Sequence, residues 1–275
     1  MDKQVRAMVI TGYGTNCELE MAQACRLGGT DQVDIVHLSE LLSGEYTLDD
    51  YHLLNLAGGF LDGDDLGAGQ AGAHRLLHAR VKTSSEPLYE QIQRFITAGK
   101  LIIGVCNGFQ LLLKTGLLPG FEQRYDRRLL SLTHNDSSRF EDRWCHLRVA
   151  PEGPCVFTRG LETLYLPVRH GEGKFVAASD TVYNLLAENQ QVVLSYADPA
   201  SGEATMRYPD NPNGSPQGIA GICDPSGRIF GLMPHPEAFL HRVNHPRWTR
   251  ENLPDEGQGV ALFRNGIDFI RQNLL

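Results

Sequence analysis

Residues Leu101–Leu113 read LIIGVCNGFQLLL, and this stretch decides the fold class. Its first five residues, Leu101–Val105, form an apolar run with the length and composition of a buried β-strand. The residues that follow, Phe109–Thr115, predict a helix. A buried strand that passes directly into a helix is typical of an α/β fold, in which parallel strands alternate with helices.

The junction between this strand and helix carries a cysteine between glycines, Gly104-Val105-Cys106-Asn107-Gly108. The pattern matches the G-x-nucleophile-x-G elbow, with Cys106 in the place of serine. A nucleophile on so tight a turn is held in a strained conformation, so the residues two positions away must be small. The following helix directs its N-terminus at Cys106, which favours the thiolate. A core cysteine between two incidental glycines is the alternative, and the flanking strand and helix favour the elbow.

The same alternation of short β-type runs and helical patterns extends through the first half of the chain. The predicted strands are Val5–Thr11, Val33–Leu38 and His52–Ala57, and the predicted helices are Glu18–Leu27 and Pro87–Ala98. Ser85 is the predicted cap of the second helix, with Pro87 in its first turn. A glycine-rich loop, Gly58–Ala73, directly follows a predicted strand, a common place for a site in an α/β sheet. We therefore expect a largely parallel sheet with helices on both faces.

The second half is richer in β-type segments and ends in a helix with an apolar face. The predicted strands are Cys145–Ala150, Gly173–Ala177, Gln191–Ala197, Gly218–Cys223 and Arg228–Met233, and the predicted helix is Gly259–Asn273. No repeat or low-complexity tract divides the chain. We expect a single domain over residues 1–275, with an irregular, polar insertion at Asp126–Arg143.

Composition argues against several classes of function. Of the 275 residues, 41% are hydrophobic and 21% are charged, as in a globular domain with a core. The formal net charge of -8 and the lack of any Lys- or Arg-rich run argue against nucleic acid as a partner. No apolar stretch is long enough to span a membrane, and the first residues lack the features of a secretory signal. We expect a cytoplasmic protein.

The cysteines show no C-x-x-C pair and no spacing typical of a metal site. They are Cys17, Cys25, Cys106, Cys145, Cys155 and Cys223. We expect reduced thiols, most of them inert in the core, and no metal site. The chain also lacks a phosphate-binding loop of the type G-x-x-x-x-G-K-[ST], so we expect no cofactor in it.

A cysteine nucleophile needs a base, and the base needs a group that orients it. The segment Met233–Glu237, MPHPE, follows a predicted strand. Its prolines favour an extended chain, in which His235 and Glu237, two residues apart, face the same way. Glu237 could then hold one imidazole nitrogen of His235 while the other meets Cys106. A proline-rich turn with a surface His and Glu is the alternative, and the cysteine elbow upstream favours a triad.

Further candidate residues belong to a possible oxyanion hole and substrate site. The backbone N–H of Asn107, directly after the nucleophile, and that of Gly59, in the glycine-rich loop, are candidate oxyanion donors. An ordinary tight turn accounts equally well for Gly59. In the segment Arg169–Gly173, RHGEG, the side chains of His170 and Glu172 could contact the ammonium or carboxylate of a substrate. Solvated side chains on a turn are the alternative there.

Together these motifs resemble the class I, or triad, glutamine amidotransferases over nearly the whole chain. The motifs, in the order of that family, are GTNCE at Gly14–Glu18, LAGGF at Leu56–Phe60, GVCNGFQ at Gly104–Gln110, HGEG at His170–Gly173, NPNGS at Asn211–Ser215 and MPHPE at Met233–Glu237. The elbow and triad specify the superfamily. HGEG, NPNGS and the asparagine after the cysteine look most like one branch, the glutaminase subunits of phosphoribosylformylglycinamidine synthases.

The resemblance implies a flavodoxin-like three-layer sandwich and a glutaminase. It implies Cys106 as the nucleophile, His235 as general base and then acid, and Glu237 as the residue that orients the imidazole. Gly59 and Asn107 would then supply the oxyanion N–H groups. Gln110 falls where the superfamily contacts bound glutamine.

The resemblance also implies a complex. Ammonia released from glutamine would pass to an ATP-dependent synthetase subunit, which makes formylglycinamidine ribonucleotide from formylglycinamide ribonucleotide in purine biosynthesis. A small accessory subunit would belong to the same complex. ATP and magnesium are expected on the synthetase partner, and weak activity is expected of this chain alone.

Some positions depart from the family pattern and leave alternatives open. The glycine loop reads GGFLDGDDLGAGQAGA at Gly58–Ala73, where the family usually has GGFSYGDYLRAGA, and Ala238 follows HPE where the family often has Arg. These changes remove no catalytic residue. The alternatives are a related cysteine hydrolase or glyoxalase, which often has His after the cysteine, an amidotransferase subunit of another synthetase, and a non-catalytic, glutamine-binding regulatory subunit.

Overall fold

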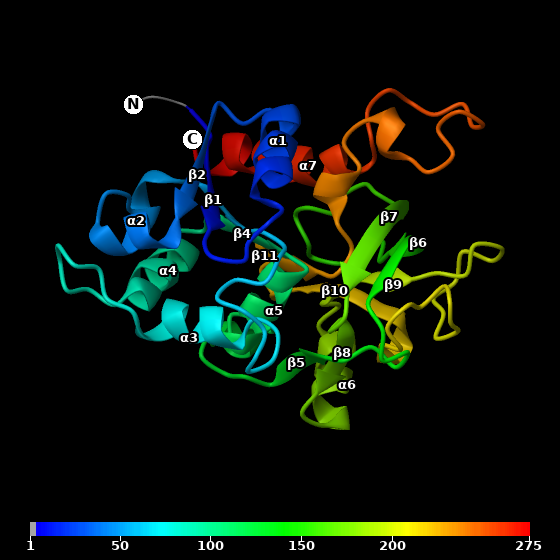
Figure 1. Ribbon diagram of the computed structural model, residues 1–275, viewed down its shortest axis with the longest axis horizontal. Helices are drawn as coiled ribbons and strands as arrows, with labels where there is room; N and C mark the ends of the chain where they lie inside the picture. Colours follow the sequence, from blue (N-terminus) through cyan, green and yellow to red (C-terminus); the bar gives the residue numbers. More distant parts are fainter. Residues whose placement is uncertain (1–3) are drawn as a thin grey trace.

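The computed structural model describes residues 4–275, in which a nine-stranded sheet forms the centre of the molecule (Figure 1). The strand order is β2-β1-β3-β4-β11-β10-β9-β6-β7. The bounds are β1 Arg6–Thr11, β2 Gln32–His37, β3 Leu53–Leu56, β4 Leu101–Val105, β6 Glu141–Val149, β7 Thr163–His170, β9 Val192–Tyr196, β10 Ile219–Cys223 and β11 Ile229–Leu232. A separate two-stranded sheet pairs β5, Leu130–Thr133, with β8, Lys174–Ala177.

The central sheet has a parallel half and an antiparallel half. Neighbouring strands from β2 through β11 are parallel, and this half carries the predicted alternation of strands and helices. The remaining pairs, from β11 to β7, are antiparallel. All residues of β3, β4 and β11 are buried, as expected for parallel strands covered on both faces. The predicted α/β class is confirmed.

Helices cover both faces of the parallel half. The helices of residues 4–275 are α1 Glu18–Gly28, α2 Leu38–Ser43, α3 Gln70–His78, α4 Leu88–Thr97, α5 Asn107–Lys114, α6 Asp180–Glu188 and α7 Gly259–Asn273, of which α6 lies beside β8 of the small sheet. Helices α1 and α7 pack together on one face, and α3, α4 and α5 gather on the other (Figure 1). The first pair approaches closely because Gly28 has no side chain: a Cβ there would lie 2.8 Å from Ile267. The sheet is therefore the middle of three layers.

Two local predictions were wrong. Ser85 does not cap α4, since it has a φ of 58° and its N–H closes a turn onto the carbonyl of Val81; Pro87 holds the cap position instead. The glycine-rich loop Gly58–Ala73 is also shorter than predicted, because α3 begins at Gln70. The helix follows Gly69, which has a φ of 72°, and includes Gly72.

The segment Asp126–Arg143, predicted to be irregular, contains β5 and the first residues of β6. Both strands are paired, with β8 and β7, so this segment belongs to the sheets. Its origin as an insertion stays a prediction. Within residues 4–275, no helix has the length and apolar character needed to cross a membrane.

Candidate active site

The predicted site residues lie on loops at the carboxyl edge of the parallel strands. Strands β3 and β11 flank β4, with Leu56 beside Gly104 and Leu232 beside Val105. The three segments that leave these strands, which are the glycine-rich loop, the cysteine elbow and MPHPE, are therefore brought together. The N–H of Cys106 donates to the carbonyl of Leu232 at 2.8 Å, which ties the elbow to the strand that leads to His235.

Cys106 occupies the strained turn that its glycines predict. Its φ is 53° and its ψ is -105°, between β4 and α5, a conformation that residues with a side chain rarely adopt. A Cβ on Gly104 would lie 2.6 Å from the carbonyl oxygen of Gly108, and a Cβ on Gly108 would overlap the carbonyl of Leu56. The predicted elbow conformation is confirmed.

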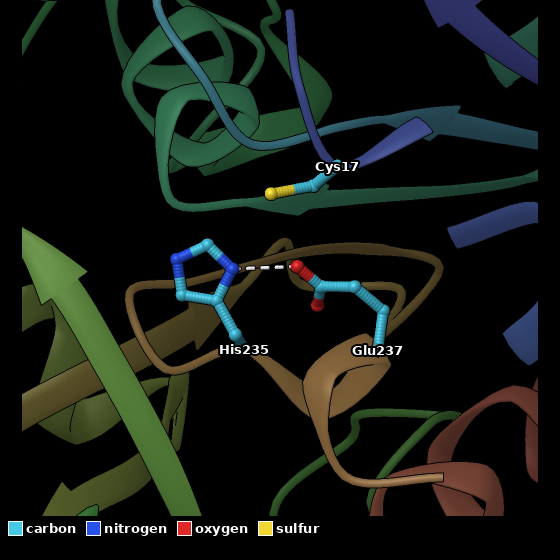
Figure 2. A group of neighbouring side chains, drawn as sticks. All are labelled: Cys17, His235 and Glu237. Carbon is cyan, nitrogen blue, oxygen red and sulfur yellow. Dashed lines mark hydrogen bonds and ion pairs between the residues drawn. The ribbon is translucent and has the colours of Figure 1, made fainter. Parts of the chain in front are cut away.

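His235 and Glu237 form a buried pair. Nδ1 of the imidazole lies 2.5 Å from Oε1 of the carboxylate, and each residue is 2% exposed (Figure 2). The backbone N–H of His235 donates to the carbonyl of Pro167 on β7 at 2.8 Å, which fixes its position. This segment was predicted to be extended, and that prediction was wrong in part, because Pro236–Ala238 form a 3₁₀ turn. This turn brings the carboxylate back to the ring.

The surroundings of His235 favour its protonated form. Burial by itself lowers the pKa of this imidazole, whereas the charge of Glu237 and the neighbouring thiols of Cys106 and Cys17 raise it. The net effect holds the pKa of His235 well above its usual value. An imidazole that binds a proton strongly beside a thiol is suited to accept the proton of that thiol.

Cys17 is a neighbour of this pair that the sequence did not single out. Its Sγ, a ring nitrogen of His235 and a carboxylate oxygen of Glu237 all lie within 4.8 Å of one another (Figure 2). The N–H groups of Asn16 and Cys17 both donate to the carbonyl of Gly58, at 3.2 and 3.3 Å, so the loop after β1 is fastened to the glycine-rich loop. No local pattern signals this contact, because 218 positions separate Cys17 from His235 and only the fold joins them.

A chain of side-chain amides joins the loops around the elbow. Oδ1 of Asn107 accepts from the N–H of Leu61 at 3.0 Å, and its Nδ2 donates to Oε1 of Gln110 at 2.9 Å. Nε2 of Gln110 donates in turn to the carbonyl of Glu172 at 2.8 Å. The side chain of Asn107, predicted only as a backbone donor, thus connects the glycine-rich loop with α5 and HGEG.

His170 is buried at the end of β7 and is not a solvated residue of a turn. Its Nδ1 lies 3.1 Å from Oδ1 of Asn135, so Nδ1 carries the proton. Burial and the charge of His235 lower the pKa of His170 to about 3, so the ring is neutral at pH 7. Its Nε2 is buried and has no hydrogen-bond partner among the described residues. The carboxylate of Glu172 accepts from the N–H of Ala68 at 3.2 Å.

Cys106 lies between two small cavities. One measures about 200 Å³, and the other about 190 Å³. The first is lined by Cys106 together with the predicted site residues Gly59, Gln110, His170 and Glu172, and the second by Cys106 with Gly59, Cys17 and His235. The structure therefore gathers the predicted catalytic, oxyanion and substrate residues around one thiol. Their individual roles stay predictions.

Residues 4–270 match the protein family described as the CobB/CobQ-like glutamine amidotransferase domain. The chain belongs to this family. The amidotransferase is 44% identical to the phosphoribosylformylglycinamidine synthase subunit PurQ of Dehalococcoides mccartyi, over 98% of this chain and 99% of the relative. It is 42% identical to a PurQ subunit of Methanococcus maripaludis, over 97% of this chain and 98% of the relative.

Solved structures agree with this assignment to the glutamine amidotransferase family. A chain in the structure of PurLQS from Thermotoga maritima matches the amidotransferase with a TM-score of 0.69 and 29% identity, over 97% of this chain and 99% of the other. Another glutamine amidotransferase from Thermotoga maritima has a TM-score of 0.55 and 16% identity, covers 98% of this chain and 99% of its own, and shares the fold. The predicted family, its predicted branch, the flavodoxin-like fold class and the enzyme class are confirmed.

Proposed function

We propose that this amidotransferase is the glutaminase subunit of a phosphoribosylformylglycinamidine synthase, in which Cys106, His235 and Glu237 release ammonia from glutamine. The observation that carries the proposal is the buried His235–Glu237 pair beside a cysteine on a strained elbow. Identity of 44% with a PurQ subunit over nearly all of both chains supports the choice of synthase.

The chemistry follows from this arrangement. His235 accepts the thiol proton, and the sulfur of Cys106 attacks the side-chain amide carbon of glutamine to form a C–S bond. The N–H groups of Gly59 and Asn107 donate to the resulting oxyanion. The imidazolium then protonates the departing ammonia as the C–N bond breaks. Water, deprotonated by His235, hydrolyses the thioester to glutamate and restores the thiol.

Glutamine would occupy the cavity of about 200 Å³ in front of Cys106. This volume is below the usual range of about 300–1,000 Å³ for drug-sized ligands, which favours an amino acid. His170 offers an unprotonated Nε2 as a hydrogen-bond acceptor, and Glu172 offers a carboxylate for the substrate's ammonium group. Gln110 also lines this cavity, with its own amide held by Asn107 and Glu172.

Ammonia would pass to a synthetase partner in the cytoplasm. The relatives are named as subunits of the synthase, and the structure of PurLQS from Thermotoga maritima contains a chain similar to this one. ATP and magnesium would bind to the synthetase subunit, and a small accessory subunit would complete the assembly. This chain would carry no cofactor of its own.

Glutamate release from glutamine, measured with and without the synthetase partner, tests the proposal. We expect release by the wild-type chain, an increase when the partner and its nucleotide substrates are added, and no release by Cys106→Ala. Release that is independent of Cys106 would overturn the catalytic assignment. Stimulation by the synthetase of another pathway, with none by a phosphoribosylformylglycinamidine synthetase, would overturn the choice of partner.

A further inference from the structure

The thiol of Cys17 faces the His235–Glu237 pair but has no part in the triad chemistry (Figure 2). From this geometry we propose that Cys17, His235 and Glu237 form a site for a thiol-binding divalent cation such as Zn²⁺, and that the bound cation switches the glutaminase off. The proposal concerns cation binding and does not depend on which synthetase the chain serves.

The donor set and its spacing suit this cation. Zn²⁺ binds thiolate sulfur, imidazole nitrogen and carboxylate oxygen at about 2.0–2.3 Å, so its ligand atoms lie roughly 3–4 Å apart. The donor atoms of Cys17, His235 and Glu237 already lie within 4.8 Å of one another. Side-chain adjustments of about an ångström, which open the 2.5 Å contact between Nδ1 of His235 and Oε1 of Glu237 and bring Sγ of Cys17 nearer, would therefore form the site. Three protein ligands leave a fourth position for water.

A buried polar atom without a partner provides a second, independent observation. Oε2 of Glu237 is buried and has no hydrogen-bond partner in the part of the chain that the structure describes. A buried carboxylate oxygen without a donor is costly. A cation beside Glu237 would stabilise this carboxylate.

The site can be reached from outside. The cavity of about 190 Å³ is lined by Cys17 and His235, together with Asn16 and Glu20 of the same loop and helix. A cation that enters there displaces the proton of the Cys17 thiol and the Nδ1 proton of the His235 imidazolium, because Nδ1 is the nitrogen that faces Glu237. Both protons pass to solvent, and the second proton of the ring stays on Nε2. The imidazole bound to the cation therefore has no free nitrogen to accept the proton of Cys106.

Titration of the full-length protein with Zn²⁺ and Co²⁺ tests the site directly. We expect one equivalent to bind to the wild type, with a thiolate-to-cobalt charge-transfer absorption. Cys17→Ala should weaken binding at least tenfold and remove that absorption. Cys106→Ala should keep both, although it is expected to lack glutaminase activity. Binding by Cys106→Ala therefore separates this proposal from the proposed catalysis.

Activity measurements provide the second readout. Zn²⁺ should inhibit glutamate release by the wild type, and a chelator should restore it. The inhibition constant for Zn²⁺ should rise at least tenfold in Cys17→Ala and Cys17→Ser. For each variant, the rate with Zn²⁺ is expressed relative to the rate of the same variant without metal. Glu20 is an exposed carboxylate that lines the same cavity. Glu20→Gln is therefore the matched control, and this variant should bind Zn²⁺ as the wild type does.

Two outcomes would overturn the proposal. Equal Zn²⁺ affinity in the wild type and in both Cys17 variants, with circular dichroism showing all three folded, would mean that Cys17 is not a ligand. Binding that persists in Cys17→Ala but disappears in Cys106→Ala would place the cation on the nucleophile instead.

Discussion

Glu237 holds one nitrogen of the His235 ring and raises the pKa of that ring through its charge. Glu237→Gln keeps the size of the side chain but removes the charge and permits the wrong tautomer. We expect kcat for glutamate release to fall by roughly 10³–10⁴-fold, as in Ser-His-Asp triads, with little change in KM. Steady-state kinetics measure both, and Glu20→Gln serves as a control. An unchanged kcat would remove Glu237 from the mechanism.

At the scale of single residues, the sequence predicted those site residues whose role follows from their immediate neighbours in the chain. Cys106 stands between glycines on a strand-to-helix turn, and His235 precedes Glu237 by two positions, so both were recognisable from the sequence. The position of Cys17 beside His235 and Glu237 was not recognisable, because it depends on a backbone contact between two loops. His170 was predicted as a candidate, but its burial follows from its place at the end of β7.

The elbow is an element whose shape depends on Gly108. Because a Cβ at this position would overlap the carbonyl of Leu56, Gly108→Ala must push α5 away from β3. We expect it to lower the free energy of unfolding by about 3 kcal/mol or more and to reduce the reactivity of Cys106. Urea unfolding and thiol-labelling rates measure these effects.

Gly160→Ala is the control for this substitution. A Cβ at Gly160 would meet nothing within 4 Å, and only its φ of 73° opposes a side chain. We expect a cost of roughly 1–2 kcal/mol there and no change in the labelling of Cys106. If Gly108→Ala cost no more than Gly160→Ala, the close approach of α5 to β3 would not be needed for the elbow.

The turn after β7 depends on a single buried amide. Nδ2 of Asn135 donates to the carbonyl of His170 at 2.8 Å, and its Oδ1 accepts from the N–H of Gly173 at 3.0 Å. Asn135→Ala would leave these backbone groups unpaired. We expect it to lower the free energy of unfolding by roughly 1–3 kcal/mol and to raise KM for glutamine. Urea unfolding and steady-state kinetics measure the two effects.

Asp136→Ala provides the comparison. It removes a partly exposed ion pair with Lys174, which should contribute less than about 1 kcal/mol. Equal stability of Asn135→Ala and Asp136→Ala would show that the buried amide does not hold the turn.

At the scale of elements, strands with a continuous apolar run could be predicted, and strands that depend on their place in the sheet could not. Leu101–Val105 is an apolar run and was predicted with its observed bounds. Thr163–His170 contains Pro167 and was not predicted as a strand. A proline is tolerated there because β7 is the edge strand of the sheet, which only the assembled sheet determines.

For the whole molecule, two buried histidines make stability depend on pH in separate windows. The pKa of His170 is lowered to about 3 in the folded protein. Between about pH 6.5 and pH 3, the unfolded chain therefore binds a proton at this residue that the folded chain does not bind. In this range the free energy of unfolding falls as the pH falls. The pKa of His235 is raised, so the stability that it contributes is complete below about 6.5 and is lost as the pH rises through its folded pKa. The acid side of the profile therefore includes the contribution of His170.

His170→Asn should flatten that acid side, because asparagine takes up no proton. Between about pH 6.5 and 4.5, we expect the free energy of unfolding to fall less steeply than in the wild type, by up to about 1.4 kcal/mol per pH unit. Part of the slope should remain, since burial also lowers the pKa of His52 and His146. Urea unfolding at a series of pH values measures the slope. Identical slopes in His170→Asn and the wild type would mean that the folded molecule protonates His170 as readily as the unfolded chain does, and that burial does not lower the pKa of this ring.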